Sequence, residues 1–177
     1  MSTRTVQKRP GRTRNEGREL LDFFFISELL RRSERVWIVS PWLRNFALFD
    51  NRAGGYGALL PEAARKEIRL VDVLRELLIR GSHVTVVTRP PPDGGGVPET
   101  LREMAAELGC PGRAVVLQRL EVHSKGIVGA RAAIIGSMNF TNSGIDVQTE
   151  IVQLTTDART VGELNMEFAQ TYPAVMT

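Results

Sequence analysis

The sequence contains a single cysteine, Cys110, and therefore cannot form a disulfide within the chain. No metal-ligand spacing surrounds this residue, so we interpret it as structural. No apolar run reaches the roughly 18 residues that a membrane span requires. No signal peptide is visible at the N-terminus, and we therefore expect a cytoplasmic protein with no membrane partner.

Internal repeats are also absent, which favours one domain. The chain has 177 residues, of which 42% are hydrophobic, and this is enough for a single core. We expect that domain to span residues 19–177.

The positive charge of the chain is concentrated at its N-terminus. The formal net charge is +3, and residues 1–18 contain six Arg or Lys residues against one Glu. Pro10, Gly11 and the lack of apolar periodicity predict a basic arm over residues 1–18 that is disordered before a partner binds. Its candidate phosphate contacts are Arg4, Lys8, Arg9, Arg12 and Arg14. A tail that only improves solubility is an equally open interpretation.

Alternating helical and strand patterns predict an α/β fold. Apolar residues at helical spacing predict helices over residues 18–32, 68–78 and 98–108, and a last helix between an N-cap at Asp157 and a stop at Pro173. Short apolar runs predict strands over residues 35–40, 83–88, 114–119, 121–128, 132–135 and 150–154. Gly81, between a helix and a strand, indicates a crossover that builds a parallel strand pair. We therefore predict a mixed β-sheet sandwiched by helices.

The segment after the first predicted strand is a candidate substrate-binding region. Open α/β sheets commonly place ligands at the C-terminal ends of their strands, and Trp42 stands at such an end. A long glycine-containing loop, residues 44–61, follows it and begins with Arg44. Trp42 and Arg44 are therefore candidate substrate contacts. The alternatives are an aromatic ring packed under the loop and a solvated arginine.

The most informative stretch runs from His123 to Glu150. His123 and Lys125 are two residues apart, so a strand over residues 121–128 would direct both side chains to one face. The run Gly136-Ser137-Met138-Asn139 then supplies small polar groups at a strand end. Such hydroxyl and amide groups suit an oxyanion such as phosphate. His83, the other histidine, stands at a strand start, where we expect a packing or surface role.

These residue types together indicate phosphoryl chemistry. Glu150 is a charged residue inside an apolar strand, where a carboxylate is normally paired, and a carboxylate can fix the tautomer of a histidine. Lys125 and Asn139 would donate to an anion, with Ser137 adding a hydroxyl. No cluster of Asp or Glu is available for a metal, so we expect a metal-independent reaction without a cofactor.

The same stretch resembles the phospholipase D superfamily, whose signature is His-x-Lys, four residues, Asp, then Gly-Ser-x-Asn. His123, Lys125, Gly136, Ser137 and Asn139 match it in order, and Glu150 falls where the family carries the acid that orients the histidine. The motif Asp would fall at Ala130 and is absent, and the Gly-Ser pair comes one residue early. Single-motif, nuclease-like members are the nearest in size and layout. The resemblance implies a phospholipase D-like fold over residues 19–177.

The resemblance also implies a mechanism. In that family one motif histidine attacks phosphorus to form a phosphohistidine, while a second histidine protonates the leaving oxygen. Because this chain has one motif copy, we expect a homodimer in which the two His123 side chains share these roles. Lys125, Ser137 and Asn139 of both subunits would hold the phosphate, and Glu150 would orient the histidine.

Three functional hypotheses remain from the sequence. The first is a phosphodiesterase, a nuclease acting on DNA rather than RNA, as a component of a DNA modification or phage-defence system with partner proteins. The basic arm favours this substrate over a lipid. The second is a catalytically inactive nucleic-acid-binding subunit, because the motif Asp is missing. The third and weakest is a phospholipid hydrolase.

Overall fold

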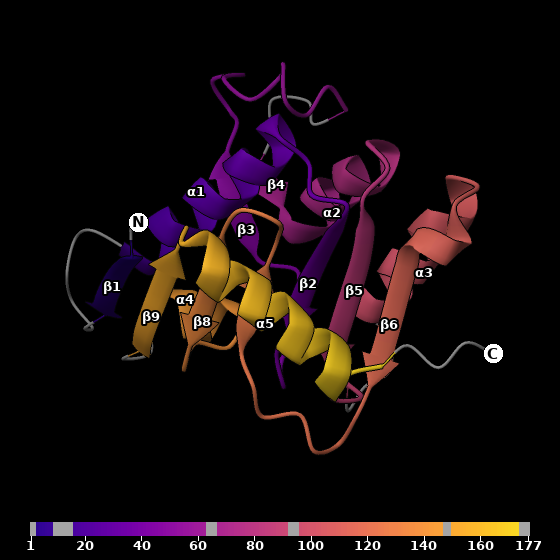
Figure 1. Cartoon of the computed structure of the whole chain (residues 1–177). Helices are drawn as coiled ribbons and strands as arrows, with labels where there is room; N and C mark the ends of the chain where they lie inside the picture. Colours follow the sequence, from indigo (N-terminus) through magenta and orange to yellow (C-terminus); the bar gives the residue numbers. More distant parts are fainter. Residues whose placement is uncertain (1–2, 9–15, 63–66, 92–95, 147–149, 174–177) are drawn as a thin grey trace.

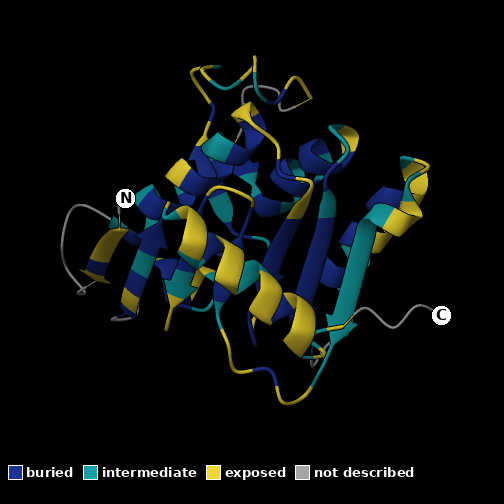
Figure 2. Cartoon of the chain, in the orientation of Figure 1, coloured by how far each residue is buried: buried dark blue, intermediate teal, exposed yellow. Residues whose placement is uncertain are grey.

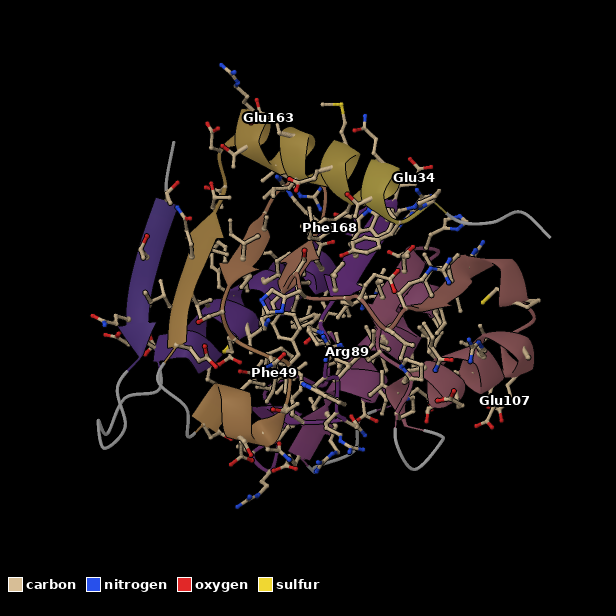
Figure 3. All side chains as sticks on the ribbon, turned by 90° about the horizontal axis from the view of Figure 1, so that it is seen from below. Glu34, Phe49, Arg89, Glu107, Glu163 and Phe168 are labelled. Atoms are coloured by element: carbon tan, nitrogen blue, oxygen red, sulfur yellow. The ribbon has the colours of Figure 1, made fainter. Side chains whose placement is uncertain are left out.

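The computed structural model describes residues 3–8, 16–62, 67–91, 96–146 and 150–173, which form three layers (Figure 1). The middle layer is a seven-stranded sheet of order β1-β9-β8-β7-β2-β5-β6. Helix α5 (Ala158–Thr171) lies on one face, and α1 (Glu16–Leu30), α2 (Leu70–Ile79) and α3 (Val97–Glu107) lie on the other (Figures 1 and 3). The predicted mixed sheet between helices is thus confirmed.

Three strands at one side of the sheet are parallel, and every other neighbouring pair is antiparallel. The strands are β1 (Thr3–Lys8), β2 (Arg35–Val39), β5 (His83–Thr88), β6 (Ala114–Gln118), β7 (Gly126–Val128), β8 (Ala133–Gly136) and β9 (Glu150–Thr155). Strand β5 pairs in parallel with both β2 and β6. The valine-rich strands β2 and β5 are buried on both faces (Figure 2), as expected for parallel strands covered by helices.

Hydrophobic side chains fill both interfaces of the sheet. The larger cluster joins the sheet to α1, α2 and α3 and includes Phe24, Leu74 and Ile38. The smaller one lies under α5, where the rings of Trp37 and Phe168 meet edge to face at 6.2 Å. No helix among the described residues is both long and apolar enough to cross a membrane.

The first strand differs from the sequence prediction of a disordered arm over residues 1–18. Thr3–Lys8 form β1, which pairs antiparallel with β9 at the edge of the sheet, and α1 begins at Glu16. Val6 is buried, and the hydroxyl of Thr3 lies 3.2 Å from that of Thr155. A single apolar residue in the strand carries no periodic signal, so the strand depends on its partner β9. Residues 9–15 lie outside the described residues.

Three further element boundaries differ from the prediction. Within the predicted loop over residues 44–61, Ala47–Asp50 form β3, which pairs with β4 (Glu67–Arg69). Ile68 therefore belongs to β4 and not to the second helix, which begins at Leu70. The predicted strand over residues 121–128 is confined to Gly126–Val128. The remaining elements are the 3-10 turn η1 (Pro111–Arg113) and α4 (Asn142–Asp146).

Candidate active site

Strand pairing brings the distant parts of the predicted motif to one edge of the sheet, which we call the site edge. The ends of β2, β8 and β1 meet the starts of β7 and β9 there. The paired residues are Val39 with Gly126, Gly126 with Ile135, Gly136 with Val152, and Glu150 with Lys8. The connection from β6 to β7 runs along this edge, at the bottom of Figure 1, and Figure 3 looks onto it.

His123 lies in the connecting segment 119–125, which passes the ends of β5 and β2. This segment cannot pair as a strand because it crosses those ends, which explains why β7 begins only at Gly126. Val122 is buried under α5, and its carbonyl accepts a hydrogen bond from Nε of Arg89 at 3.2 Å. The backbone before His123 is therefore anchored, while the His123 side chain is exposed.

Lys125 contacts the backbone of His123. Its Nζ donates to the His123 carbonyl oxygen at 2.8 Å. The ammonium group therefore lies beside the histidine although neither residue is in a strand, and an anion near the His123 ring would be within the field of this charge.

Gly136 is required by the close approach of β8 and β9. Its φ is +157°, and a Cβ at this position would collide with the carbonyl oxygen of Ile151. Ser137 follows directly: its backbone NH donates to that carbonyl at 3.0 Å, and its Oγ accepts from the Ile151 NH at 3.0 Å. The glycine thus allows Ser137 to be fixed at the start of β9.

Replacing Gly136 by alanine should separate β8 from β9 at Ser137. We expect the free energy of unfolding to fall by about 1–3 kcal/mol, the usual cost of forcing extra atoms into a packed site. Thermal and chemical unfolding would measure this change. Gly112→Ala is the matched control, because a Cβ there meets nothing within 4 Å. Equal stability of the two variants would contradict the role of the close strand approach.

Glu150 is buried and hydrogen bonded to Ser137. The residue is only 8% exposed, and its Oε2 accepts a hydrogen bond from the hydroxyl of Ser137. Among the described residues the structure shows no hydrogen bond between the His123 ring and Glu150, so the orienting role of Glu150 stays a prediction. Within the same ranges, no three His, Cys, Asp or Glu side chains are grouped closely enough to hold a metal ion.

Asn139 has an unsatisfied acceptor at the site edge. Its Oδ1 is buried and has no hydrogen-bond partner among the described residues. The next residue, Phe140, is tied to the segment after β2: its NH donates to Ser40 Oγ at 3.3 Å, and its carbonyl accepts from the Arg44 NH at 2.9 Å. The Asn139 turn and the segment that carries Trp42 and Arg44 therefore lie side by side.

Arg89 is a site-edge residue that the sequence analysis missed. It follows β5 directly, half-buried near the centre of Figure 3, and its guanidinium carbon lies 5.7 Å from the centre of the Trp42 ring. Trp42 is 43% exposed and therefore is not packed under the loop. The rule that directed attention to Trp42 at the end of β2 applies equally to the end of β5 and could have found Arg89.

The basic arm is only partly described. Arg4 lies 3.5 Å from Glu19 as an exposed ion pair, away from the site edge. Lys8 is the last residue of β1, opposite Glu150 at the site edge. Arg9, Arg12 and Arg14 lie outside the described residues.

Ala130, where the motif Asp would fall, lies at the other end of β7 from His123. It belongs to the turn between β7 and β8, and its backbone NH donates to Ser33 Oγ at 2.6 Å. Ser33 in turn donates its NH and hydroxyl to the carboxylate of Glu28 at 2.9 Å each. Burial raises the pKa of Glu28, and the hydrogen bonds from Ser33 offset this only in part. A carboxylate of α1 therefore supports the turn in which the motif Asp is missing.

Restoring the motif residue by Ala130→Asp should not increase activity. The new carboxylate would lie near that of Glu28, far from the site edge, so we expect cleavage within about twofold of wild type and a loss of about 0.5–1 kcal/mol in stability at pH 7. Because burial raises the pKa of Glu28, acid should protonate it before ordinary carboxylates, so the loss should become smaller as the pH falls. Unfolding over a range of pH, with Glu28→Gln as background, tests this. A tenfold gain in activity would contradict it.

Sequence comparison identifies the family. Residues 59–172 match the family model described as "Cardiolipin synthase, PLD-like domain". This match covers more than half of the chain and includes every motif residue, so the chain belongs to the phospholipase D-like domain family, as the sequence predicted. A search of curated protein sequences found no match.

Solved structures show the same fold over nearly the whole chain. NucT from Helicobacter pylori has a TM-score of 0.61 at 13% identity, covering 98% of this chain and 96% of NucT. Nuc from Salmonella typhimurium, described as a phospholipase D family member, has a TM-score of 0.58 at 13% identity, covering 98% and 95%. The archaeal chromatin protein TrmBL2, described with a novel mode of DNA binding, has a TM-score of 0.54 at 9% identity, covering 96% and 51%.

Proposed function

We propose that the protein is a metal-independent phosphodiesterase that cleaves nucleic acid through His123 in a homodimer. The observation that carries the proposal is the convergence of the motif at the site edge. There the segment of His123 and Lys125, the Ser137–Asn139 turn and Glu150 are brought together by the pairing of β7, β8 and β9. These groups offer a nucleophile in His123, a cation in Lys125 and the side-chain amide of Asn139 as a donor for one phosphate. The hydroxyl of Ser137 donates to Glu150.

The position of the second histidine supports a dimer. The chain has two histidines, and His83 begins β5 at the edge of the sheet opposite the site edge. One chain can thus supply only one histidine to the site, whereas a two-fold axis at the site edge would supply two. Leu120, three residues before His123, is 77% exposed and suits such an interface.

In the proposed reaction the ring nitrogen of one His123 attacks phosphorus while the bond to the leaving oxygen breaks. The partner's His123, protonated, gives its proton to that oxygen. It then accepts a proton from water, which attacks phosphorus and breaks the phosphorus–nitrogen bond. Lys125, which lies beside the backbone of His123, offsets the charge that develops on the phosphate oxygens. The hydrogen bond from Ser137 to the buried Glu150 holds the turn after β8 in place.

A nucleic-acid substrate is supported by the charge of the residues that follow β1 in the sequence. Strand β1 ends with Lys8 at the site edge, and Arg9, Arg12 and Arg14 follow it in the sequence. Cations that extend from the end of β1 would be suited to bind the neighbouring phosphates of a polymer. DNA rather than RNA as substrate, a DNA modification or phage-defence system with partner proteins, and a cytoplasmic location stay predictions from the sequence.

A second candidate function is nucleic-acid binding without turnover. The observation in its favour is that Glu150 is bonded to Ser137 and not to His123 in the single chain. The fold shared with TrmBL2, whose description concerns DNA binding, is compatible with it. A lipid substrate is the weaker third candidate, and the family description that names cardiolipin synthase is its support.

Cleavage and binding of nucleic acid in excess EDTA separate these candidates. Single- and double-stranded DNA and RNA would be incubated with the wild-type protein, and phospholipid vesicles would be tested in parallel. Cleavage of a nucleic acid in EDTA supports the proposal. Tight binding of nucleic acid without cleavage supports the second candidate, and turnover of vesicles alone supports the third.

A further inference from the structure

The ends of β2 and β5 form a hollow beside the His123 segment. Its walls come from the segment after β2, the end of β5 and the start of α3. Trp42 and Arg89 are among the residues that line it. The hollow lies at the site edge because Arg89 donates through Nε to the carbonyl of Val122, the residue before His123.

Arg89 is held in place by three contacts. Its NH donates to the Pro41 carbonyl at 3.3 Å, its Nε bonds to Val122, and its guanidinium carbon lies 5.7 Å from the centre of the Trp42 ring. None of these contacts engages its terminal amino groups, and no carboxylate among the described residues pairs with it. A half-buried guanidinium without a carboxylate partner is suited to bind a phosphate in two-point fashion.

Trp42 is both exposed and fixed. Trp42 is 43% exposed although the guanidinium of Arg89 lies over its ring, and the Trp42 carbonyl accepts a hydrogen bond at 2.7 Å from the hydroxyl of Ser40, which is fully buried. An exposed aromatic ring beside a cationic groove is the arrangement by which proteins stack the bases of single-stranded nucleic acids. Stacking needs an unpaired, accessible base face.

We propose that Trp42 and Arg89 form a nucleotide subsite next to the scissile phosphate. Trp42 stacks on a base, and the terminal amino groups of Arg89 bind the phosphate of that nucleotide. The subsite selects single-stranded nucleic acid, because the bases of a duplex are already stacked on both faces. This inference rests on the proposed function for the identity of the neighbouring site.

Oligonucleotide cleavage tests the subsite against a substrate that cannot use it. We expect Trp42→Ala to raise KM for a single-stranded oligonucleotide about 10-fold, Trp42→Phe to restore most of the loss, and Arg89→Gln to act in the same direction. In the Trp42 variants, hydrolysis of bis(p-nitrophenyl) phosphate, which has no adjacent nucleotide, should stay within about twofold. In Arg89→Gln it should fall as well, because Arg89 also holds the Val122 carbonyl next to His123. Ile79→Ala, which truncates an exposed apolar residue at the end of α2, is the matched control.

Two outcomes would overturn the subsite. One is an equal loss of activity in Trp42→Ala toward the oligonucleotide and toward the small ester, which would mean that Trp42 acts only through the fold or the reaction itself. The other is an unchanged KM for the oligonucleotide in Trp42→Ala. The selection of single strands would be overturned if a duplex bound as tightly as a single strand and if its binding depended equally on Trp42.

Binding measurements decide the subsite even if the wild-type protein cleaves nothing. The chain has two tryptophans, and Trp37 is 3% exposed. A single-stranded oligonucleotide should therefore quench the fluorescence of Trp42, and an oligonucleotide with abasic sites should not. Quenching without cleavage would support the subsite and reject the proposed function, whereas equal binding of both oligonucleotides without quenching would reject the subsite.

Discussion

Replacing His123 by alanine is expected to lower phosphodiester cleavage by at least about 10⁴-fold, because a covalent route loses its nucleophile. The variant should fold normally, since the His123 side chain is exposed and its segment is anchored by Val122 and Arg89. Initial rates in EDTA and thermal unfolding would measure the two effects. Binding of the oligonucleotide should change much less than cleavage.

The chain offers a matched control in its other histidine. His83 begins β5 at the opposite edge of the sheet, so His83→Ala should leave the rate within about twofold. Full cleavage by His123→Ala would exclude the phosphohistidine route. A comparable loss in both variants, with no loss of stability, would mean that the site edge is not the catalytic site.

If the proposed dimer forms through the site edge, Leu120→Arg is expected to convert it to a monomer and to reduce cleavage by at least about 100-fold. Leu120 is the most exposed of the large hydrophobic residues described and lies in the His123 segment. At a two-fold interface each substitution is present twice, so the charge of one subunit would face that of the other. Molar mass by light scattering and initial rates on the same samples would test this.

Met166→Arg is the control for the Leu120 experiment. Met166 is 60% exposed on α5, away from the site edge, so the proposed dimer should persist in this variant. A Leu120→Arg protein that is monomeric and fully active would show that one chain is sufficient. A Leu120→Arg protein that stays dimeric would place the interface elsewhere.

The α/β fold could be predicted because its central elements carry strong local signals. The valine runs of β2 and β5, the leucine periodicity of α2 and the cap at Asp157 each depend on residues close in sequence. The cap is confirmed by the bond from the Thr160 NH to Asp157 at 3.1 Å. Strand β1 could not be predicted in this way, because its one buried apolar residue, Val6, gives no alternation and its pairing is with residues 150–155.

The residues that meet at the site edge could be selected from the sequence, but their contacts could not, and their catalytic roles stay a prediction. The motif residues were found from spacing, whereas the bond from Ser137 to Glu150 depends on the register of β8 and β9. Glu28 supports the Ala130 turn through Ser33 although the two residues are about a hundred positions apart, and no local sequence pattern predicts this contact. Arg89 was missed because an arginine after a strand is common and carries no motif.

Mixing wild-type and His123→Ala subunits tests most directly whether two copies of His123 build one site. The two proteins would be unfolded together in equal amounts, refolded and assayed for cleavage in EDTA. If both histidines of a dimer are needed, only dimers of two wild-type chains cleave. These make up one quarter of all dimers, so the activity should be about one quarter of that of wild-type protein at the same total concentration. Activity of one half would show that each chain works alone and would contradict the shared site.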